Sequence, residues 1–347
     1  MVRILLVIAV GITACAAPIP RDGEAPAGYS NTLEDGRELI VISAPSVDDP
    51  YYAEDFGAIL DFDIRFAAAV LGRDNVVVLA DRETMPRLEG KLPGEILLRA
   101  SVPDIWIRDF APVSPGRPVR FSYRPRYLKP ADARFIQSGF DRFARRRGLR
   151  FATAALVLDG GNLVDNGEGR AVVTSRVLED NPGLTPGEVR LLLKNSLGLT
   201  DLAIIPEEAG DATGHADGMV AWASADTLLL NRYDEPFRSA VLAVLEEGLP
   251  GVGVVEVEAN FSPEVRDGFA SACGLNVNAV TTERFIYVPV FGHPADREFL
   301  ETLRRHTEKV VVPVDAEAVC SLGGSVRCLS WQVTGENARR LIEAARK

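Results

Sequence analysis

The sequence predicts an α/β protein made of repeated modules that close into a ring, and three observations lead to this fold. A pair of short apolar strands, a helix and a further strand recur along the chain. One polar residue stands near the first strand of each round, in steps of 50, 58, 61 and 50 residues: Asp109, Asp159, Asp217, Asn278 and Cys328. Such a period indicates a radial or solenoidal repeat, and in a closed ring these positions would converge. An α/β sheet protein with scattered acids is the alternative.

The first half of the chain supplies two rounds. Residues 38–45, 53–72 and 75–81 read as strand, amphipathic helix and strand, and 104–113 read as a further strand that contains Arg108 and Asp109. Residues 155–178 read as a hairpin whose turn is Asp165-Asn166-Gly167. A helix follows with Thr185 as N-cap, Pro186 at its first position and Gly198 as its stop, and 202–208 read as a strand.

The second half continues the pattern. A hairpin over 215–234, a helix over 235–248 and a strand over 252–259 are followed by strands in 274–292, a helix over 294–306 and a strand over 309–317. Residues 323–333 and the terminal helix give part of a final round, with Cys328 just inside its strand. In the hairpin over 215–234, His215 and Asp217 are two residues apart and would share one face of a strand.

Composition limits the partners. The 347 residues carry a formal net charge of −11, which argues against nucleic acid or an anionic membrane surface and suits a small cationic substrate. The four cysteines, at 15, 273, 320 and 328, are too sparse for a disulfide framework, and we expect Cys273 and Cys320 to be packing residues. The sequence contains no paired CxxC or HExxH motif that would predict a metal site, and no phosphate-loop lysine that would predict nucleotide binding.

The N-terminus reads as an export signal. A short basic start precedes an apolar stretch from Ile4 to Ala14, which is too short to span a bilayer. The stretch ends at Cys15 in a sequence that resembles a bacterial lipobox, so we expect a signal peptide over 1–14, lipidated Cys15 and a flexible tether over 15–37. A plain cleaved signal peptide is the alternative. Residues 38–347 form a single domain, and the N-terminal lipid is the expected membrane contact.

Two segments carry candidate chemistry. Cys328 follows Arg327, and a nearby cation can favour a thiolate nucleophile, whereas a buried structural cysteine is the alternative. His215 lies between glycines and beside Asp217, which favours a functional role over that of a satisfied core histidine. A buried Asp109 would need a cation or hydrogen-bond donors.

These segments occur in order as WIRDFAP, LDGGNLVDNGEG, GHADG, NVNAV…VPVFG and GGSVRC. In that order they resemble the motifs of the agmatine deiminase and bacterial-type peptidyl-arginine deiminase family, from about Leu39 to Gln332. The resemblance implies the pentein fold, a pseudo-fivefold α/β propeller of ββαβ modules. It also implies hydrolysis of a guanidinium group, on agmatine or on free or peptidyl arginine, with release of ammonia and without a metal or other cofactor.

The resemblance implies a role for each matched residue. Cys328 would be the nucleophile, and His215 the general acid and then the base. Asp109 and Asp217 would bind the guanidinium, and Asp159 would orient His215. Asn278 and Trp106 are further expected substrate contacts.

This sequence departs from the family pattern at three places, one of which is the GGS of residues 323–325 in place of a fuller glycine run. Arg327 precedes the cysteine where agmatine deiminases usually have histidine, and Asp159 is one methylene shorter than the usual glutamate. Arg327 would either help to stabilise the thiolate or pair with a surface acid. Two other classes stay open: an exported guanidine-binding lipoprotein without turnover, and a cysteine protease that uses His215 and Cys328.

Overall fold

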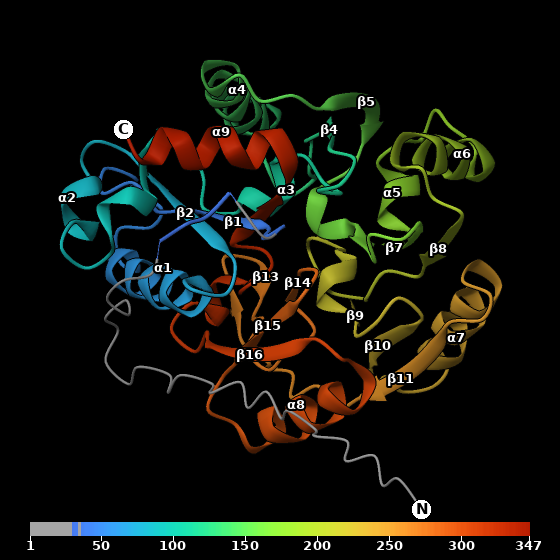
Figure 1. The fold of residues 1–347 in the computed structure, drawn as a ribbon. Helices are drawn as coiled ribbons and strands as arrows, with labels where there is room; N and C mark the ends of the chain where they lie inside the picture. Colours follow the sequence, from blue (N-terminus) through green and yellow to red (C-terminus); the bar gives the residue numbers. More distant parts are fainter. Residues whose placement is uncertain (1–29, 34–35) are drawn as a thin grey trace, which may run out of the picture.

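The computed structural model describes residues 30–33 and 36–347, and the predicted signal peptide and Cys15 lie outside them. The described residues form five modules around a common centre, with helices α1, α4, α6, α7 and α8 on the outside of the ring (Figure 1). This is the pseudo-fivefold α/β propeller that the repeat and the resemblance predicted. Among the described residues, no helix is both long and apolar enough to cross a membrane.

Each module pairs two antiparallel segments and returns through a helix to a strand parallel to the second segment. In chain order, three modules consist of β6 (Val164–Asp165), β7 (Arg170–Thr174), α6 (Pro186–Leu197) and β8 (Asp201–Ile205); β9 (Val220–Trp222), β10 (Thr227–Asn231), α7 (Phe237–Gly248) and β11 (Gly253–Val257); and β14 (Val280–Thr281), β15 (Phe285–Val290), α8 (Pro294–His306) and β16 (Val310–Asp315). These agree closely with the predicted rounds.

The module that precedes them is less regular. Its antiparallel segment is reduced to a bridge between Val113 and Val119. The rest of it consists of β4 (Val119–Ser122), α4 (Pro130–Arg147) and β5 (Ala152–Val157). Because β5 pairs in parallel with β4, residues 155–157 do not belong to the hairpin predicted over 155–178, which is formed by β6 and β7 alone.

The ring closes by pairing the two ends of the described chain. The strand β17 (Ser330–Val333) runs antiparallel to β1 (Leu39–Ser43), with Leu39 opposite Val333. The module then continues through α1 (Phe56–Val70) to β2 (Asn75–Ala80). The incomplete final round of the sequence is therefore completed by the first strand and helix of the chain.

The remaining elements connect or extend the modules. They are α2 (Met85–Leu88), η1 (Gly94–Ile96), β3 (Leu97–Arg99), α3 (Ile107–Phe110), η2 (Gly160–Asn162), α5 (Arg176–Glu179), η3 (Ala216–Gly218), β12 (Val265–Arg266), β13 (Phe269–Ala270), η4 (Cys320–Leu322) and α9 (Gly335–Ala345). An apolar core lies between each outer helix and its sheet, with α6, for example, contributing Val189 and Leu193.

Local sequence signals set the helix ends. Thr185 caps α6 in a reciprocal capping box with Glu188, Pro186 is the first helical residue, and Gly198 ends the helix with φ of 73°. All three predicted roles are confirmed.

Three predictions about the chemistry-bearing segments are wrong. Ile107–Phe110 is a helical turn rather than part of a strand, and η3 begins directly after His215, so His215 and Asp217 do not lie in a strand. Cys328 lies two residues ahead of β17 rather than inside it. In each case the chain turns at the inner edge of the ring before the first strand of a module, which period-two reasoning does not detect.

Candidate active site

The predicted convergence occurs. A cavity of about 740 Å³ is lined by Trp106, Asp109, His215, Asp217, Asn278 and Cys328, among others. Five turns carry the periodic polar residues, each at the start of its module. Asp159 lies behind the cavity wall, where its carboxylate contacts both His215 and Tyr127.

His215 lies between two carboxylates. Its Nε2 is 3.3 Å from Oδ2 of Asp159, and its Nδ1 is 3.8 Å from Oδ1 of Asp109. Oδ1 of Asp109 also accepts a hydrogen bond of 3.1 Å from the amide of Gly161. A Cβ at Gly161 would lie 2.4 Å from Nδ1 of His215, so the glycine permits this close approach.

The carboxylates keep His215 protonated. Burial alone would lower its pKa, but Asp109 and Asp159 outweigh burial and raise it to about 10. Burial raises the pKa of Asp109 to about 7, with further increases from Asp159 and Asp217 and an opposing effect of His215. At neutral pH the imidazolium can therefore donate a proton, as a general acid must.

Asn278 orients the nucleophile. Its Nδ2 is 3.1 Å from Sγ of Cys328, and its Oδ1 accepts from the hydroxyl of Ser325 at 3.0 Å and from the amide of Cys328 at 3.4 Å. A Cβ at Gly324 would lie 2.5 Å from the ring of Trp106 and 2.9 Å from Cβ of Cys328. The second glycine of the GGS motif is thus needed for the wall of the cavity.

The surroundings of Cys328 disfavour its thiolate. Burial raises the pKa of the Cys328 thiol well above its ordinary value, and the negative charges of Asp217 and Asp109 raise it further, although Asn278 has the opposite effect. A cation that enters the cavity would offset those charges. The nucleophile is consequently activated best when a cationic substrate is bound.

Arg327 is buried and contacts Asp217, not a surface acid. Its Nη1 is 2.8 Å from Oδ2 of Asp217, and its Nη2 donates to the carbonyl of Leu163 at 2.6 Å. The interpretation of Arg327 as the partner of a surface acid is therefore wrong.

Several residues of the cavity were not identified from the sequence. Tyr127 donates to Asp159 at 3.3 Å and packs its ring against Phe269, with 5.4 Å between ring centroids. Six further carboxylates line the cavity or its mouth: Asp49, Asp104, Asp132, Glu208, Asp211 and Asp267. Asp104 and Asp211 lie just ahead of the WIRDFAP and GHADG motifs, and the other four lie outside the motifs, so no sequence signal marked the six as a group.

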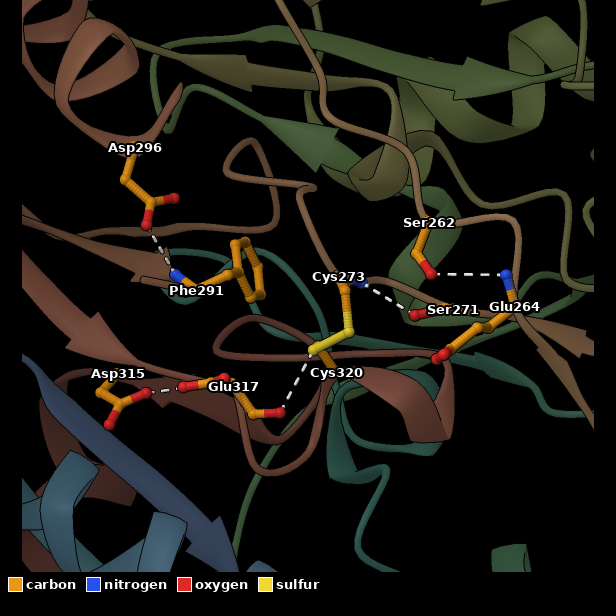
Figure 2. Close-up of a disulfide and its surroundings, with 9 residues drawn as sticks. All are labelled: Ser262, Glu264, Ser271, Cys273, Phe291, Asp296, Asp315, Glu317 and Cys320. Atoms are coloured by element: carbon orange, nitrogen blue, oxygen red, sulfur yellow. Dashed lines mark hydrogen bonds between the residues drawn. A yellow bond between two sulfur atoms is a disulfide. The ribbon is translucent and has the colours of Figure 1, made fainter. Parts of the chain in front are cut away.

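Cys273 and Cys320 form a disulfide, so the expectation that they are packing residues is wrong (Figure 2). The bond links residues 47 apart in sequence and lies behind two lining segments, Ala270–Ala272 and Leu322–Gly323. The amide of Ala272 donates to the carbonyl of Cys320 at 2.8 Å. Among the described residues, Cys328 is the free cysteine.

The described side chains include no group of three or more His, Cys, Asp or Glu residues arranged to hold a metal ion. The carboxylates of the cavity instead contact His215, Arg327, hydroxyl groups and backbone amides. Their arrangement suits hydrogen bonding to a planar cation.

Comparison with known proteins identifies related sequences. The model of the Porphyromonas-type peptidyl-arginine deiminase family matches residues 35–334. A putative agmatine deiminase 1 of Listeria monocytogenes (strain F2365) is 24% identical over 314 residues, covering 77% of this chain and 85% of that protein. The agmatine deiminase of Stutzerimonas stutzeri is 25% identical over 218 residues, covering 53% of this chain and 58% of that protein.

Solved structures share the fold. An agmatine deiminase of C. jejuni superposes with a TM-score of 0.72 at 17% identity, covering 88% of this chain and 96% of that one. A putative peptidyl-arginine deiminase gives the same TM-score at 19% identity, and the match covers 88% of this chain and 98% of that one. These similarities show that the propeller is shared.

Proposed function

This chain belongs to the Porphyromonas-type peptidyl-arginine deiminase family, and from that premise we propose that it hydrolyses a guanidinium group. The products would be ammonia and a ureido compound. The observation that carries the proposal is the convergence of a free thiol, a histidine held between two carboxylates, and Asp217 on one cavity.

Binding and activation are one step in this proposal. Asp109 and Asp217 accept hydrogen bonds from the guanidinium and place its carbon near Sγ of Cys328. The substrate's positive charge offsets the two carboxylates that disfavour the thiolate. Cys328 then releases its proton to solvent in the open cavity, and the resulting thiolate attacks the guanidinium carbon.

His215 serves both halves of the reaction. Its imidazolium protonates the departing nitrogen, and ammonia leaves an amidino group bonded to sulfur. The neutral imidazole then takes a proton from water, which attacks the same carbon and releases the sulfur and the ureido product. Asp159, 3.3 Å from Nε2, holds the ring in position throughout.

The cavity supports a substrate whose chain ends in a cation or a neutral amide rather than a carboxylate. None of the described lining residues is a lysine or an arginine. Arg266 lines a small adjoining cavity, where its guanidinium makes two hydrogen bonds, of 2.9 and 2.5 Å, to Asp55. A substrate carboxylate would therefore lie among the six further acidic side chains, and no lysine or arginine of the described lining could pair with it.

The mouth of the cavity supports the same substrate class. Phe135, Tyr51 and Phe261 line it while 62%, 57% and 42% exposed. Aromatic faces beside carboxylates attract organic cations. A volume of about 740 Å³ is of the size that holds drug-sized ligands, so agmatine and an arginine inside a basic peptide both fit this chemistry.

Matched substrates test the proposal. Arginine and arginine amide differ at the carboxyl group, so ammonia release should have a kcat/KM at least about tenfold higher for the amide. Agmatine and peptides with internal or C-terminal arginine complete the series. Peptides with C-terminal arginine should have a low kcat/KM, because they carry a carboxylate beside the reacting side chain. Ammonia release from none of these compounds would contradict deimination, and binding without release would favour the binding-protein alternative.

We also propose that the enzyme is exported and held by a lipid on Cys15. The lipobox-like sequence supports this, and so does the Cys273–Cys320 disulfide, since such bonds persist mainly in oxidising compartments. Cys15→Ser should release the protein from membranes, because acyl chains would be its anchor. Retention of the variant on membranes after a salt wash would contradict the proposal.

A further inference from the structure

The environment of Arg327 is unusual for an arginine. Its side chain is 9% exposed and that of Asp217 is 2% exposed, with 2.8 Å between Nη1 and Oδ2. Asp217 lines the active cavity, whereas Arg327 lines a second cavity of about 590 Å³. The guanidinium therefore reaches Asp217 from behind the catalytic wall.

Both ends of Arg327 are fixed. Its backbone amide donates to the carbonyl and to Oδ1 of Asn278, at 3.1 and 3.2 Å. Its Nη2 donates to the carbonyl of Leu163 at 2.6 Å, and its own carbonyl accepts from Nε of Arg108 at 3.3 Å. With its backbone held by Asn278 and one guanidinium nitrogen held by Leu163, Arg327 offers Asp217 a donor of fixed direction.

The oxygen that Arg327 holds is the one nearest the nucleophile. Oδ2 of Asp217 is 3.8 Å from Sγ of Cys328. With Oδ2 held by Nη1 and facing Sγ, the carboxylate is prevented from rotating, which fixes the directions in which it can accept hydrogen bonds from a ligand. The distance between the guanidinium's anchor and the attacking sulfur then depends on Arg327.

We propose that Arg327 is a positioning residue that fixes Asp217 for alignment of the substrate guanidinium with Cys328. The proposal rests on the proposed function and adds to it a residue that touches neither the substrate nor the reacting atoms. Arg327 acts through the orientation of one carboxylate, and its positive charge also compensates a buried anion.

A double-mutant cycle with Asp217 tests this role. Arg327→Gln alone should lower kcat/KM for agmatine or arginine amide by about 10- to 100-fold, because a displaced carboxylate misaligns the substrate. In an Asp217→Asn background the same change should cause no further loss, or a gain, since it removes a buried cation that would repel the guanidinium. Arg327→Lys keeps a charged donor and should recover much of the activity.

Controls separate positioning from folding. Rates are expressed per free thiol titrated, and Arg120→Gln, which removes a partly buried pair with Asp141 (Nε to Oδ1 3.4 Å), should leave kcat/KM unchanged. If Asp217→Asn is too slow to assay, the cycle is read as Kd for agmatine in Cys328→Ala proteins. There Arg327→Gln should tighten binding to the Asp217→Asn form.

The outcomes are distinct. Equal fold-losses from Arg327→Gln in both backgrounds, or weaker binding in the Asp217→Asn form, would overturn the positioning role while the enzyme remains a deiminase. Wild-type protein that releases no ammonia from any guanidine would overturn the proposed function and this role together.

Discussion

Two large cavities of the ring have similar volumes, but their acidic side chains are compensated differently. The active cavity, of about 740 Å³, is lined by carboxylates with no lysine or arginine among its described residues. The second cavity, of about 590 Å³, is also lined by acids, but Arg108, Arg117, Arg327 and Lys309 accompany them. The negative charge of the second cavity is thus compensated by cationic side chains of the protein itself.

This difference shows what makes one cavity a binding site for a cation. Carboxylates out of bulk water are costly without a partner. In the active cavity, His215 and the pair between Asp217 and Arg327 supply part of the compensation, and the proposed substrate supplies the rest. The Asp217–Arg327 pair joins the walls of the two cavities.

The largest expected effect removes the nucleophile of the active cavity. Cys328→Ala should lower kcat by at least about 10⁴-fold, as loss of a catalytic nucleophile does, with unfolding temperature little changed. Labelling by iodoacetamide of the peptide that contains residue 328 should be lost with it, since Cys328 is the free cysteine of the described residues. If the purified variant released ammonia at the wild-type rate, Cys328 would not be the nucleophile, and its cavity would not be the active one.

The next effect concerns the wall of the active cavity. The double change Cys273→Ala and Cys320→Ala should lower the free energy of unfolding by about 4 kcal/mol, because a bond between residues 47 apart restricts the unfolded chain. We expect KM to rise as the linked lining segments loosen. Denaturant unfolding measures the first effect. Reductant should lower the unfolding midpoint of the wild type but not that of the variant, and equal responses would contradict the disulfide between Cys273 and Cys320.

A partly buried acid of the second cavity, Glu38, should affect stability but not catalysis. Burial raises the pKa of Glu38 from 4.5 to about 7, against a hydrogen bond from the Glu283 amide and the charge of Lys309. Because the folded-state pKa is the higher one, the contribution of Glu38 is fully present below pH 4.5 and is lost as pH rises through about 7.

Glu38→Gln should therefore stabilise the protein by about 1–3 kcal/mol at pH 8 relative to wild type, with little change at pH 4. Urea unfolding at both pH values measures this, and kcat/KM should stay at the wild-type value. A large loss of activity would mean that the second cavity takes part in catalysis.

The smallest effect is the pH dependence of the active cavity. Asp109, with a pKa of about 7, must be ionised to hold the cation, and His215, with a pKa of about 10, must be protonated to act as acid. We expect kcat/KM to fall about tenfold per unit below pH 7 and again above pH 10. In Asp109→Asn the limb near pH 7 should disappear; its persistence would assign it to another group.

Local signals in the sequence determined the modules. The helix from Pro186 to Leu197 was predicted with both of its ends because Thr185, Pro186 and Gly198 act through bonds within a few residues. Hairpin turns and apolar strands are similarly local. The ordered motifs identified the family, and the period of the polar residues predicted that Asp109, Asp159, Asp217, Asn278 and Cys328 would converge. Four of them line one cavity, and Asp159 lies behind its wall against His215.

Only the tertiary structure decided how distant segments complete one another. Pairing of β17 with β1 closes the ring across almost the whole chain, and the closed ring brings Arg327 to Asp217, 110 residues away in sequence. Packing at the two ends of one module brings Cys273 to Cys320. The charge of the active cavity likewise depends on which distant side chains share its wall. Such contacts arise from packing of whole modules, so the residues near them in sequence carry no signal of the partner.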